Sequence, residues 1–171
     1  MTRAFKLIIF GDAAVGKTTL VKRCITGFFS DTILMTLGME IHTKELILDD
    51  TPVVLQVWDL AGEKNFRLLL PNYCVGAHGG IFIYDITSPP SLAHLGDWMS
   101  IVRENAPDLP VIVAGAKKDL EDESKVTIDE AKSQGADFDI AAFFEVSSKT
   151  GENVEDLFEA ITRLMLDSYK I

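Results

Sequence analysis

The sequence predicts an α/β fold, a three-layer sandwich in which a six-stranded, mostly parallel sheet carries helices on both faces. Short apolar stretches alternate along the chain with amphipathic helical patterns, which is typical of βαβ units. Two apolar stretches, Ile41–Leu48 and Val53–Trp58, are instead joined directly by Asp49 to Pro52. Because so short a connection forces antiparallel pairing, we expect one antiparallel strand at the edge of the sheet.

The strands and helices follow from the apolar patterns in chain order. Strands are predicted at Lys6–Phe10, Ile41–Leu48, Val53–Trp58, Gly80–Asp85, Val111–Ala114 and Phe143–Val146. Helices are predicted at Lys17–Gly27, near Phe66–Tyr73, and at Ser91–Asn105, Thr127–Gly135 and Asn153–Ser168. The last helix is the clearest, because its apolar residues recur every three or four positions and form one stripe. Residues Thr150 to Asn153 offer N-cap side chains for it.

Length and composition predict one globular domain. A chain of 171 residues can bury a full core, so we expect a single domain over residues 1–171. Apolar residues make up 47% and charged residues 25%, which is ordinary for a soluble protein. The formal net charge of −10 argues against a nucleic-acid partner and against a surface for anionic membranes.

The cysteines and the chain ends bear on the cellular compartment. Cys24 and Cys74 lie in apolar surroundings without metal-ligand spacing, so we expect reduced, buried thiols in a cytoplasmic protein, with a disulfide as the alternative. The segment Met1–Phe10 reads as the first strand and not as a signal peptide. No stretch approaches the roughly 18 apolar residues of a membrane span. The last five residues contain no prenylation cysteine, so membrane contact would need a partner or a missing tail.

The sequence GDAAVGKT matches the phosphate-loop pattern G-x-x-x-x-G-K-[ST] and stands between a predicted strand and a predicted helix. Backbone N–H groups of such a loop, together with the helix N-terminus, point at one anion. Lys17 would reach the terminal phosphates, and the Thr18 hydroxyl would bind Mg²⁺. The alternative is a chance match in a tight turn. The motif predicts the P-loop NTPase version of the α/β sandwich, with a phosphate site formed by Gly11, Asp12, Ala13, Ala14, Val15, Gly16, Lys17, Thr18 and Thr19.

A second polar segment follows the predicted strand Val53–Trp58. The Asp59 carboxylate can hold a water on Mg²⁺, and the Gly62 backbone N–H can approach a γ-phosphate because no side chain intervenes. The alternative is an ordinary Asp-x-x-Gly turn. Since ligands of parallel sheets bind at the carboxyl ends of the strands, this position favours a functional role.

Two further segments follow the strands Val111–Ala114 and Phe143–Val146. The Asp119 carboxylate can accept hydrogen bonds from the N1–H and the exocyclic amine of guanine, and adenine offers no such pair. The stem of Lys117 can cover the base. In the loop Ser147-Ser148-Lys149, the Ser148 N–H could meet the guanine carbonyl. A solvated charged turn and a helix cap are the alternatives for these two segments.

GDAAVGKT, WDLAGE, AKKDL and SSK, in this order, resemble the motifs of the Ras-superfamily small GTPases over essentially the whole chain. The segments WDLAGEKNFR, NYCVGAHGG and YDITSPPSLAHLGDW are most similar to the Rab-like branch, which acts in vesicle trafficking. The resemblance implies a molecular switch that binds GTP or GDP with Mg²⁺ and hydrolyses GTP. It also implies that Thr36 is a Mg²⁺ ligand touching the γ-phosphate and that the Phe29 ring stacks on guanine. The residues alone favour a loop hydroxyl and a core aromatic ring.

The resemblance further implies that effector, exchange-factor and GTPase-activating proteins bind at Thr32–Ile41 and Ala61–Tyr73. We expect the chain to be a monomer. The apolar residues expected to form an effector patch are Ile33, Leu34, Met35, Leu68, Leu69 and Leu70. Core packing is the alternative for the last three.

Three departures from the family pattern bear on mechanism. Glu63 stands where the family usually has the glutamine that orients the attacking water, so we expect slow hydrolysis carried by Glu63, Lys17 and Gly62; a solvent-facing Glu63 is the alternative. Ala116 replaces the asparagine that ties the base loop to the phosphate loop, which predicts weaker nucleotide binding. The methyl groups of Ala13 and Ala14 would slightly crowd the γ-phosphate.

Two other functions remain open at this point. A nucleotide-holding scaffold with negligible turnover would also explain Glu63 and Ala116. An ATP-using P-loop kinase would need an arginine-rich lid and a second substrate pocket, neither of which the sequence indicates, and Asp119 favours guanine.

Overall fold

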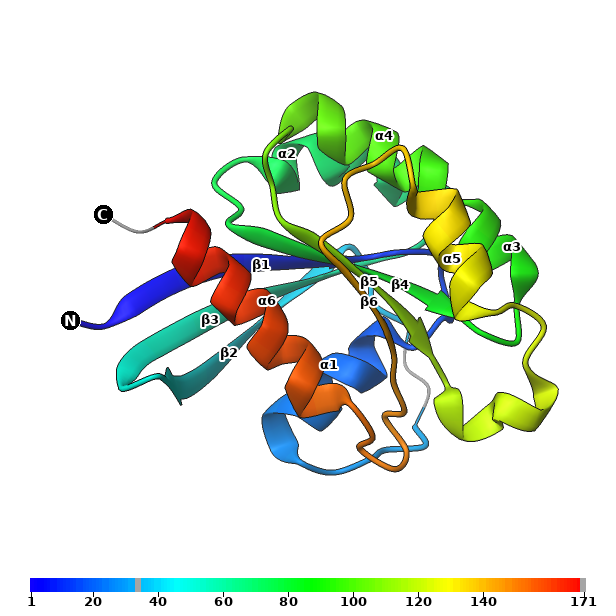
Figure 1. Cartoon of the computed structure of the whole chain (residues 1–171), viewed down its shortest axis with the longest axis horizontal. Helices are drawn as coiled ribbons and strands as arrows, with labels where there is room; N and C mark the ends of the chain where they lie inside the picture. Colours follow the sequence, from blue (N-terminus) through cyan, green and yellow to red (C-terminus); the bar gives the residue numbers. More distant parts are fainter. Residues whose placement is uncertain (33–34, 170–171) are drawn as a thin grey trace.

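One six-stranded sheet forms the middle layer of the molecule, with the strand order β2-β3-β1-β4-β5-β6 (Figure 1). The computed structural model describes residues 1–32 and 35–169. The strands are β1 (Arg3–Phe10), β2 (Met39–Leu48), β3 (Thr51–Leu60), β4 (Gly79–Asp85), β5 (Val111–Ala116) and β6 (Ala142–Glu145). Every neighbouring pair is parallel except β2 and β3, so the predicted fold class is confirmed.

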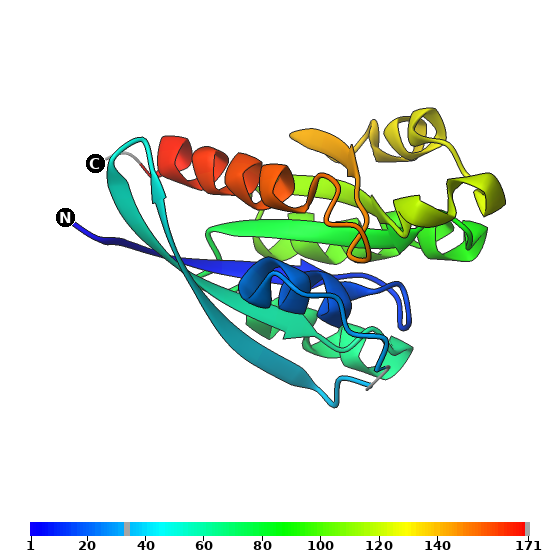
Figure 2. The same cartoon turned by 90° about the horizontal axis from the view of Figure 1, so that it is seen from below.

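The antiparallel hairpin of β2 and β3 is longer than the sequence pattern indicated. Its ladder runs from Leu48 paired with Thr51 to Met39 paired with Leu60. The turn is only Asp49-Asp50, and both residues have positive φ, 49° and 62°. Two such residues match the twist of the strands, so pairing continues into residues that the sequence assigned to the turn. The turn lies near the end of the last helix, where Arg163 Nη2 donates to Asp49 Oδ1 at 3.2 Å (Figure 2).

Helices cover both faces of the sheet. They are α1 (Lys17–Thr26), η1 (Lys64–Leu69), α2 (Leu70–Cys74), α3 (Pro89–Ala93), α4 (Leu95–Asn105), η2 (Lys118–Glu123), α5 (Ile128–Gly135) and α6 (Val154–Ser168). The predicted helix over Ser91–Asn105 is in fact two, because the backbone at His94 (ψ 0°) breaks the regular turn between α3 and α4. The short helix η2 was not predicted, since its charged sequence carries no apolar period.

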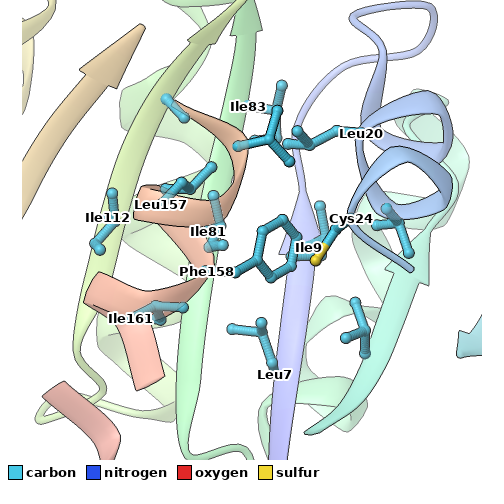
Figure 3. Close-up of a cluster of buried hydrophobic side chains, with 14 of the residues drawn as sticks. Leu7, Ile9, Leu20, Cys24, Ile81, Ile83, Ile112, Leu157, Phe158 and Ile161 are labelled. Carbon is cyan, nitrogen blue, oxygen red and sulfur yellow. The ribbon is translucent and has the colours of Figure 1, made fainter. Parts of the chain in front are cut away.

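Two hydrophobic cores lie on opposite faces of the sheet. On one face, α1 and α6 pack against β1, β4 and β5, as Figure 3 shows for Phe158 and Ile161 of α6 lying over Leu7 and Ile81. On the other face, α2, α3, α4 and α5 surround Trp98 and Tyr84. Loop residues at the carboxyl edge of the sheet belong to both cores, Val15 and Val146 to the first and Ile86 and Val126 to the second, so the loops at that edge are anchored from both sides.

The helix starts differ in their caps. Thr127 and Glu130 form a complete capping box at α5. Asn153, in contrast, makes no cap hydrogen bond to α6. Its Nδ2 donates instead to Glu145 O at 2.8 Å, and its φ of 60° precludes the usual cap geometry, so the predicted capping by this residue is wrong.

Cys24 and Cys74 are buried, and neither forms a disulfide. Among the described residues, no helix has the length and apolar character needed to cross a membrane.

Candidate functional site

The four predicted loops meet around one cavity at the carboxyl edge of the sheet. Its volume is about 570 Å³. The lining residues are Ala13, Ala14, Gly16, Lys17, Thr18, Thr19, Lys22, Phe29, Ser30, Asp31, Thr32, Met35, Thr36, Leu60, Ala61, Gly62, Glu63, Ala116, Lys117, Asp119, Leu120, Ser148 and Lys149. A second hollow of about 560 Å³, between the C-terminus of α1 and the N-terminus of α6, contains none of the predicted site residues.

Five of the predicted site residues do not line the cavity. They are Gly11, Asp12, Val15, Asp59 and Ser147. Val15 points into the core, where it is 2% exposed. The other four shape the loop backbone or hold a lining side chain, as described below.

The phosphate loop leaves β1 through a conformation that requires glycine. Gly11 has a φ of 143°, and a Cβ built there would lie 2.2 Å from Ile83 O of β4. The loop therefore packs directly on the neighbouring strand. At its other end Gly16, with a φ of 103°, is the N-cap residue before α1, whose N-terminus faces the cavity.

Lys17 is a buried cation at the cavity wall. Its Nζ donates to Asp12 O at 2.5 Å. Burial lowers the pKa of Lys17 to about 8, and the nearby carboxylates Asp59, Asp12 and Glu63 only partly oppose this. An anion in the cavity would restore the charged form.

A pH dependence of nucleotide affinity follows from this lysine. Because a phosphate prefers protonated Lys17, the dissociation constant for GDP is expected to rise about tenfold per pH unit above pH 8. Titrating a fluorescent GDP analogue between pH 7 and 9.5 measures the slope. In Lys17→Arg, whose guanidinium stays charged, the residual binding should be independent of pH; a flat profile in the unmodified protein would contradict the assignment.

Three oxygen donors from three elements converge beside Lys17. Thr18 Oγ1 lies 2.6 Å from Thr36 Oγ1, and it donates to Asp59 Oδ2 at 2.5 Å. Asp59 is fully buried, and burial raises the pKa of its carboxyl group. Hydroxyl and carboxylate oxygens are the ligands that Mg²⁺ prefers, so this donor set fits the ion that the sequence predicts.

The loop after β5, for which the sequence predicts base binding, is tied to the phosphate loop without an asparagine. Lys117, at a positive φ of 67°, places Nζ 2.6 Å from Asp85 Oδ2 and 3.3 Å from Ala14 O. Burial disfavours the Asp85 charge, but Lys117 and Thr87 outweigh it and lower the pKa of that carboxyl. Lys117 thus links the two loops through its side chain, whereas the neighbouring Ala116 has no polar group that could do so.

The Asp119 carboxylate is held in place by a hydrogen bond from Ser147. Ser147 is buried, and its Oγ donates to Asp119 Oδ1 at 2.7 Å while accepting from Thr150 N at 3.1 Å. A carboxylate has further acceptor sites, which remain for a ligand. Phe29 lines the same cavity and is 36% exposed, so it is not the core aromatic that the residues alone suggested.

The segment after β3 closes the phosphate side of the cavity. A Cβ on Gly62 would lie 2.3 Å from both Ala13 N and Asp12 C, so the two backbones touch. Glu63 lines the cavity, and its Oε2 is buried without a hydrogen-bond partner among the described residues. One Glu63 oxygen is thus turned away from solvent, while the residue as a whole is half-buried.

The Asp12 side chain makes contacts that the sequence did not predict. His94 Nδ1 lies 2.5 Å from Oδ2, and Trp98 Nε1 donates to Oδ1 at 2.9 Å. Arg67 of η1 reaches Oδ1 at 3.4 Å and stacks 4.8 Å above the Trp98 ring. Asp12 thus accepts from Lys17 through its backbone oxygen, while its side chain is bound by His94, Trp98 and Arg67.

Sequence reasoning thus missed Asp85, Arg67, His94 and Trp98. Asp85 carried a usable signal, since it ends a buried parallel strand at the edge where the other site residues stand. The other three carried none, because only tertiary packing brings them to Asp12.

Several apolar side chains are exposed on the two chain segments that contribute Met35, Thr36 and Gly62 to the cavity wall. Met35 and Leu68 are 68% and 80% exposed, and Leu69 is also exposed. Leu70 is fully buried in the core, so its predicted place in an effector patch is wrong. Leu37 and Ile41, not included in that prediction, are exposed as well; Ile33 and Leu34 lie outside the described residues.

A phosphate loop between a strand and a helix, in a three-layer α/β sandwich with this strand order, is the defining feature of P-loop nucleotide-binding proteins. The model of the Ras family matches residues 6–167. The chain belongs to the Ras family, and it is therefore a GTP-binding small GTPase, of the kind that binds GTP or GDP with Mg²⁺ and acts with regulator and effector proteins.

Proposed function

We propose that this chain is a guanine-nucleotide switch of the Rab-like branch, formed by a single domain over residues 1–171 and working as a monomer in vesicle trafficking. Its GTP hydrolysis is slow. The observation that carries the proposal is the single cavity shared by the phosphate loop, Thr36, Gly62 and Asp119. The phosphates, the Mg²⁺ bound to them and the base belong to one ligand, so the residues that bind them must lie around one continuous cavity.

The phosphate end would work through positioning and charge. The loop N–H groups hold the phosphates and Lys17 neutralises their charge. Thr18 and Thr36 would hold Mg²⁺ directly and Asp59 through a water; the ion supplies charge neutralisation of the transferred phosphate. The Gly62 N–H would meet the γ-phosphate, since its backbone already touches the loop.

The base end would select guanine. Phe29 and the stem of Lys117 cover the two faces of the ring, and Asp119 accepts from its N–H groups. The remaining base contacts would come from Ser148 and Lys149 in the cavity wall, with Ser147 holding Asp119 in place.

Slow turnover follows from Glu63. A carboxylate cannot donate toward the γ-phosphate, and its charge repels that group. Glu63→Gln is expected to raise single-turnover GTP hydrolysis by about tenfold, because the amide both donates and accepts. Glu104→Gln, on the exposed face of α4 away from the cavity, is the control. An unchanged or lower rate in Glu63→Gln would show that this residue does not limit hydrolysis.

Partner binding is proposed at Thr32–Ile41 and Ala61–Tyr73. Both segments carry exposed apolar residues and both line the nucleotide cavity, so loss of the γ-phosphate would loosen them together. Effectors, exchange factors and GTPase-activating proteins would distinguish the ordered from the loosened conformation of these two segments. Membrane contact would be peripheral, through a partner or a lipidated tail.

A nucleotide-holding scaffold without useful turnover is the second candidate. The buried, unpartnered Glu63 oxygen favours it, since a carboxylate beside the proposed γ-phosphate position would oppose the approach of an attacking water. Phosphate release, measured with and without candidate activating proteins, separates a slow enzyme from this scaffold.

The experiment that tests the binding proposal identifies the nucleotide that co-purifies with the protein and compares fluorescent GDP and ADP analogues. We expect guanine nucleotides and strong preference for the GDP analogue. The release rate from the same complex measures how far Ala116 weakens binding despite the Lys117 link. Indifference between the two analogues would contradict the proposal.

A further inference from the structure

Three side chains that can bind metals share one face of the β2–β3 hairpin. Glu40 and His42 are two residues apart on β2, so they point to the same side. Asp59 of β3 is paired directly with Glu40, and directly paired residues of an antiparallel ladder share a face. The topology therefore gathers two carboxylates and one imidazole at one point.

The donor atoms of Glu40, His42 and Asp59 all lie within 4.8 Å of one another. His42 Nε2 and Glu40 Oε2 are 3.4 Å apart. Zinc bonds of about 2.1 Å in tetrahedral geometry place two ligands about 3.4 Å apart, so this pair is already at ligand spacing. Glu40 is half-exposed, and its side chain is free to shorten the remaining distances.

Two atoms of this group are buried without a hydrogen bond among the described residues: His42 Nε2 and Asp59 Oδ1. The 3.4 Å contact between His42 and Glu40 lacks hydrogen-bond geometry, which is why the imidazole nitrogen still has no partner. Asp59 is fully buried, and its other oxygen, Oδ2, is used by Thr18. Such atoms are costly to leave unsatisfied, and one cation between them would satisfy both.

We propose that Glu40, His42 and Asp59 bind a divalent transition-metal ion of the Zn²⁺ class. The site shares Asp59 with the Mg²⁺ donor set and would use its Oδ1, since Oδ2 is bound to Thr18. An imidazole ligand selects Zn²⁺, Co²⁺ or Ni²⁺ over Mg²⁺, which prefers an all-oxygen shell. Three protein ligands leave a fourth position for water.

The consequence of such an ion is local. Glu40 is the second residue of β2 and lies only four residues after Thr36, so a metal bound here would fix the end of that loop to Asp59 on β3. The proposal does not depend on which nucleotide the cavity takes, because none of the three donors belongs to the base-binding loops.

The test is a zinc titration of the full chain against a chromophoric chelator, in millimolar Mg²⁺ with GDP present, followed by Co²⁺ absorption spectroscopy. We expect one equivalent of Zn²⁺ to bind, and a visible Co²⁺ spectrum indicating a nitrogen ligand. His42→Gln and Glu40→Gln should each weaken zinc binding by at least about tenfold. Neither substitution empties the core, since both side chains are partly exposed.

Two matched controls locate the ion. Glu45→Gln changes an exposed glutamate on the opposite face of β2, and His94→Gln removes the histidine beside Asp12; both should bind zinc like the unmodified chain. Equal affinity in His42→Gln and the unmodified chain, loss in His94→Gln alone, or no binding below 1 mM zinc would each overturn the proposal. Thermal melting of every variant verifies folding. The readout needs no nucleotide turnover, so a failure of GTP binding would leave it intact.

Discussion

Replacing Asp119 with asparagine is expected to lower the affinity for GDP by about 10³-fold and to create affinity for xanthosine diphosphate. In the proposed base site the carboxylate would accept from two guanine N–H groups, and hydrogen bonds to a charged group contribute about 1.5–3 kcal/mol each. The asparagine amide would face those donors with its own N–H, whereas the xanthine carbonyl could accept from it. Competition titration with both nucleotides measures the change.

The matched control for this substitution is Asp122→Asn. Asp122 lies exposed in the same short helix, η2, outside the cavity, so its loss of charge should leave GDP affinity within about twofold. Asp119→Asn also keeps an oxygen for Ser147, so the loop should stay in place. Equal losses in the two variants would indicate a general charge effect and would contradict the base assignment.

Gly11→Ala is expected to destabilise the fold by more than about 4 kcal/mol. Its Cβ would lie 2.2 Å from Ile83 O, and that atom belongs to a buried central strand that cannot retreat. Both the clash and the φ of 143° act in the same direction. Urea unfolding monitored by circular dichroism measures the loss, or shows that the variant does not fold.

Gly27→Ala separates the two causes. Gly27 also has a positive φ, 75°, but a Cβ there meets nothing within 4 Å. Its cost should therefore be the backbone term alone, about 1–2 kcal/mol. If Gly11→Ala were no worse than Gly27→Ala, the close approach of the phosphate loop to β4 would have no energetic weight.

Most of the fold was predictable, because it depends on local periodicity. The alternation of apolar strands with amphipathic helices gave the sheet, and the short link after Leu48 gave its antiparallel edge. The break at His94 was not predictable, since the apolar pattern runs through it without interruption. The wrong prediction of Asn153 as a cap has a similar reason. Its side chain donates to the backbone oxygen of Glu145, a contact that no local sequence pattern indicates.

The site divides in the same way. Lys17, Thr18 and Asp119 sit in motifs whose chemistry can be read from residue type and spacing. The residues that support these site residues cannot be predicted from such local patterns. Asp85 beneath Lys117, Ser147 beneath Asp119, and the Glu40–His42–Asp59 group depend on register and packing between segments far apart in the chain.

The contacts of Asp12 have an entropic consequence. Arg67, His94 and Trp98 hold its carboxylate from the helix layer, while Gly11 rests on β4. The phosphate loop is thus preorganised, and little conformational freedom remains to be lost when an anion binds. We therefore expect Arg67 of η1, His94 and Trp98 of α4 to raise the affinity for the anion by keeping the loop in its binding conformation.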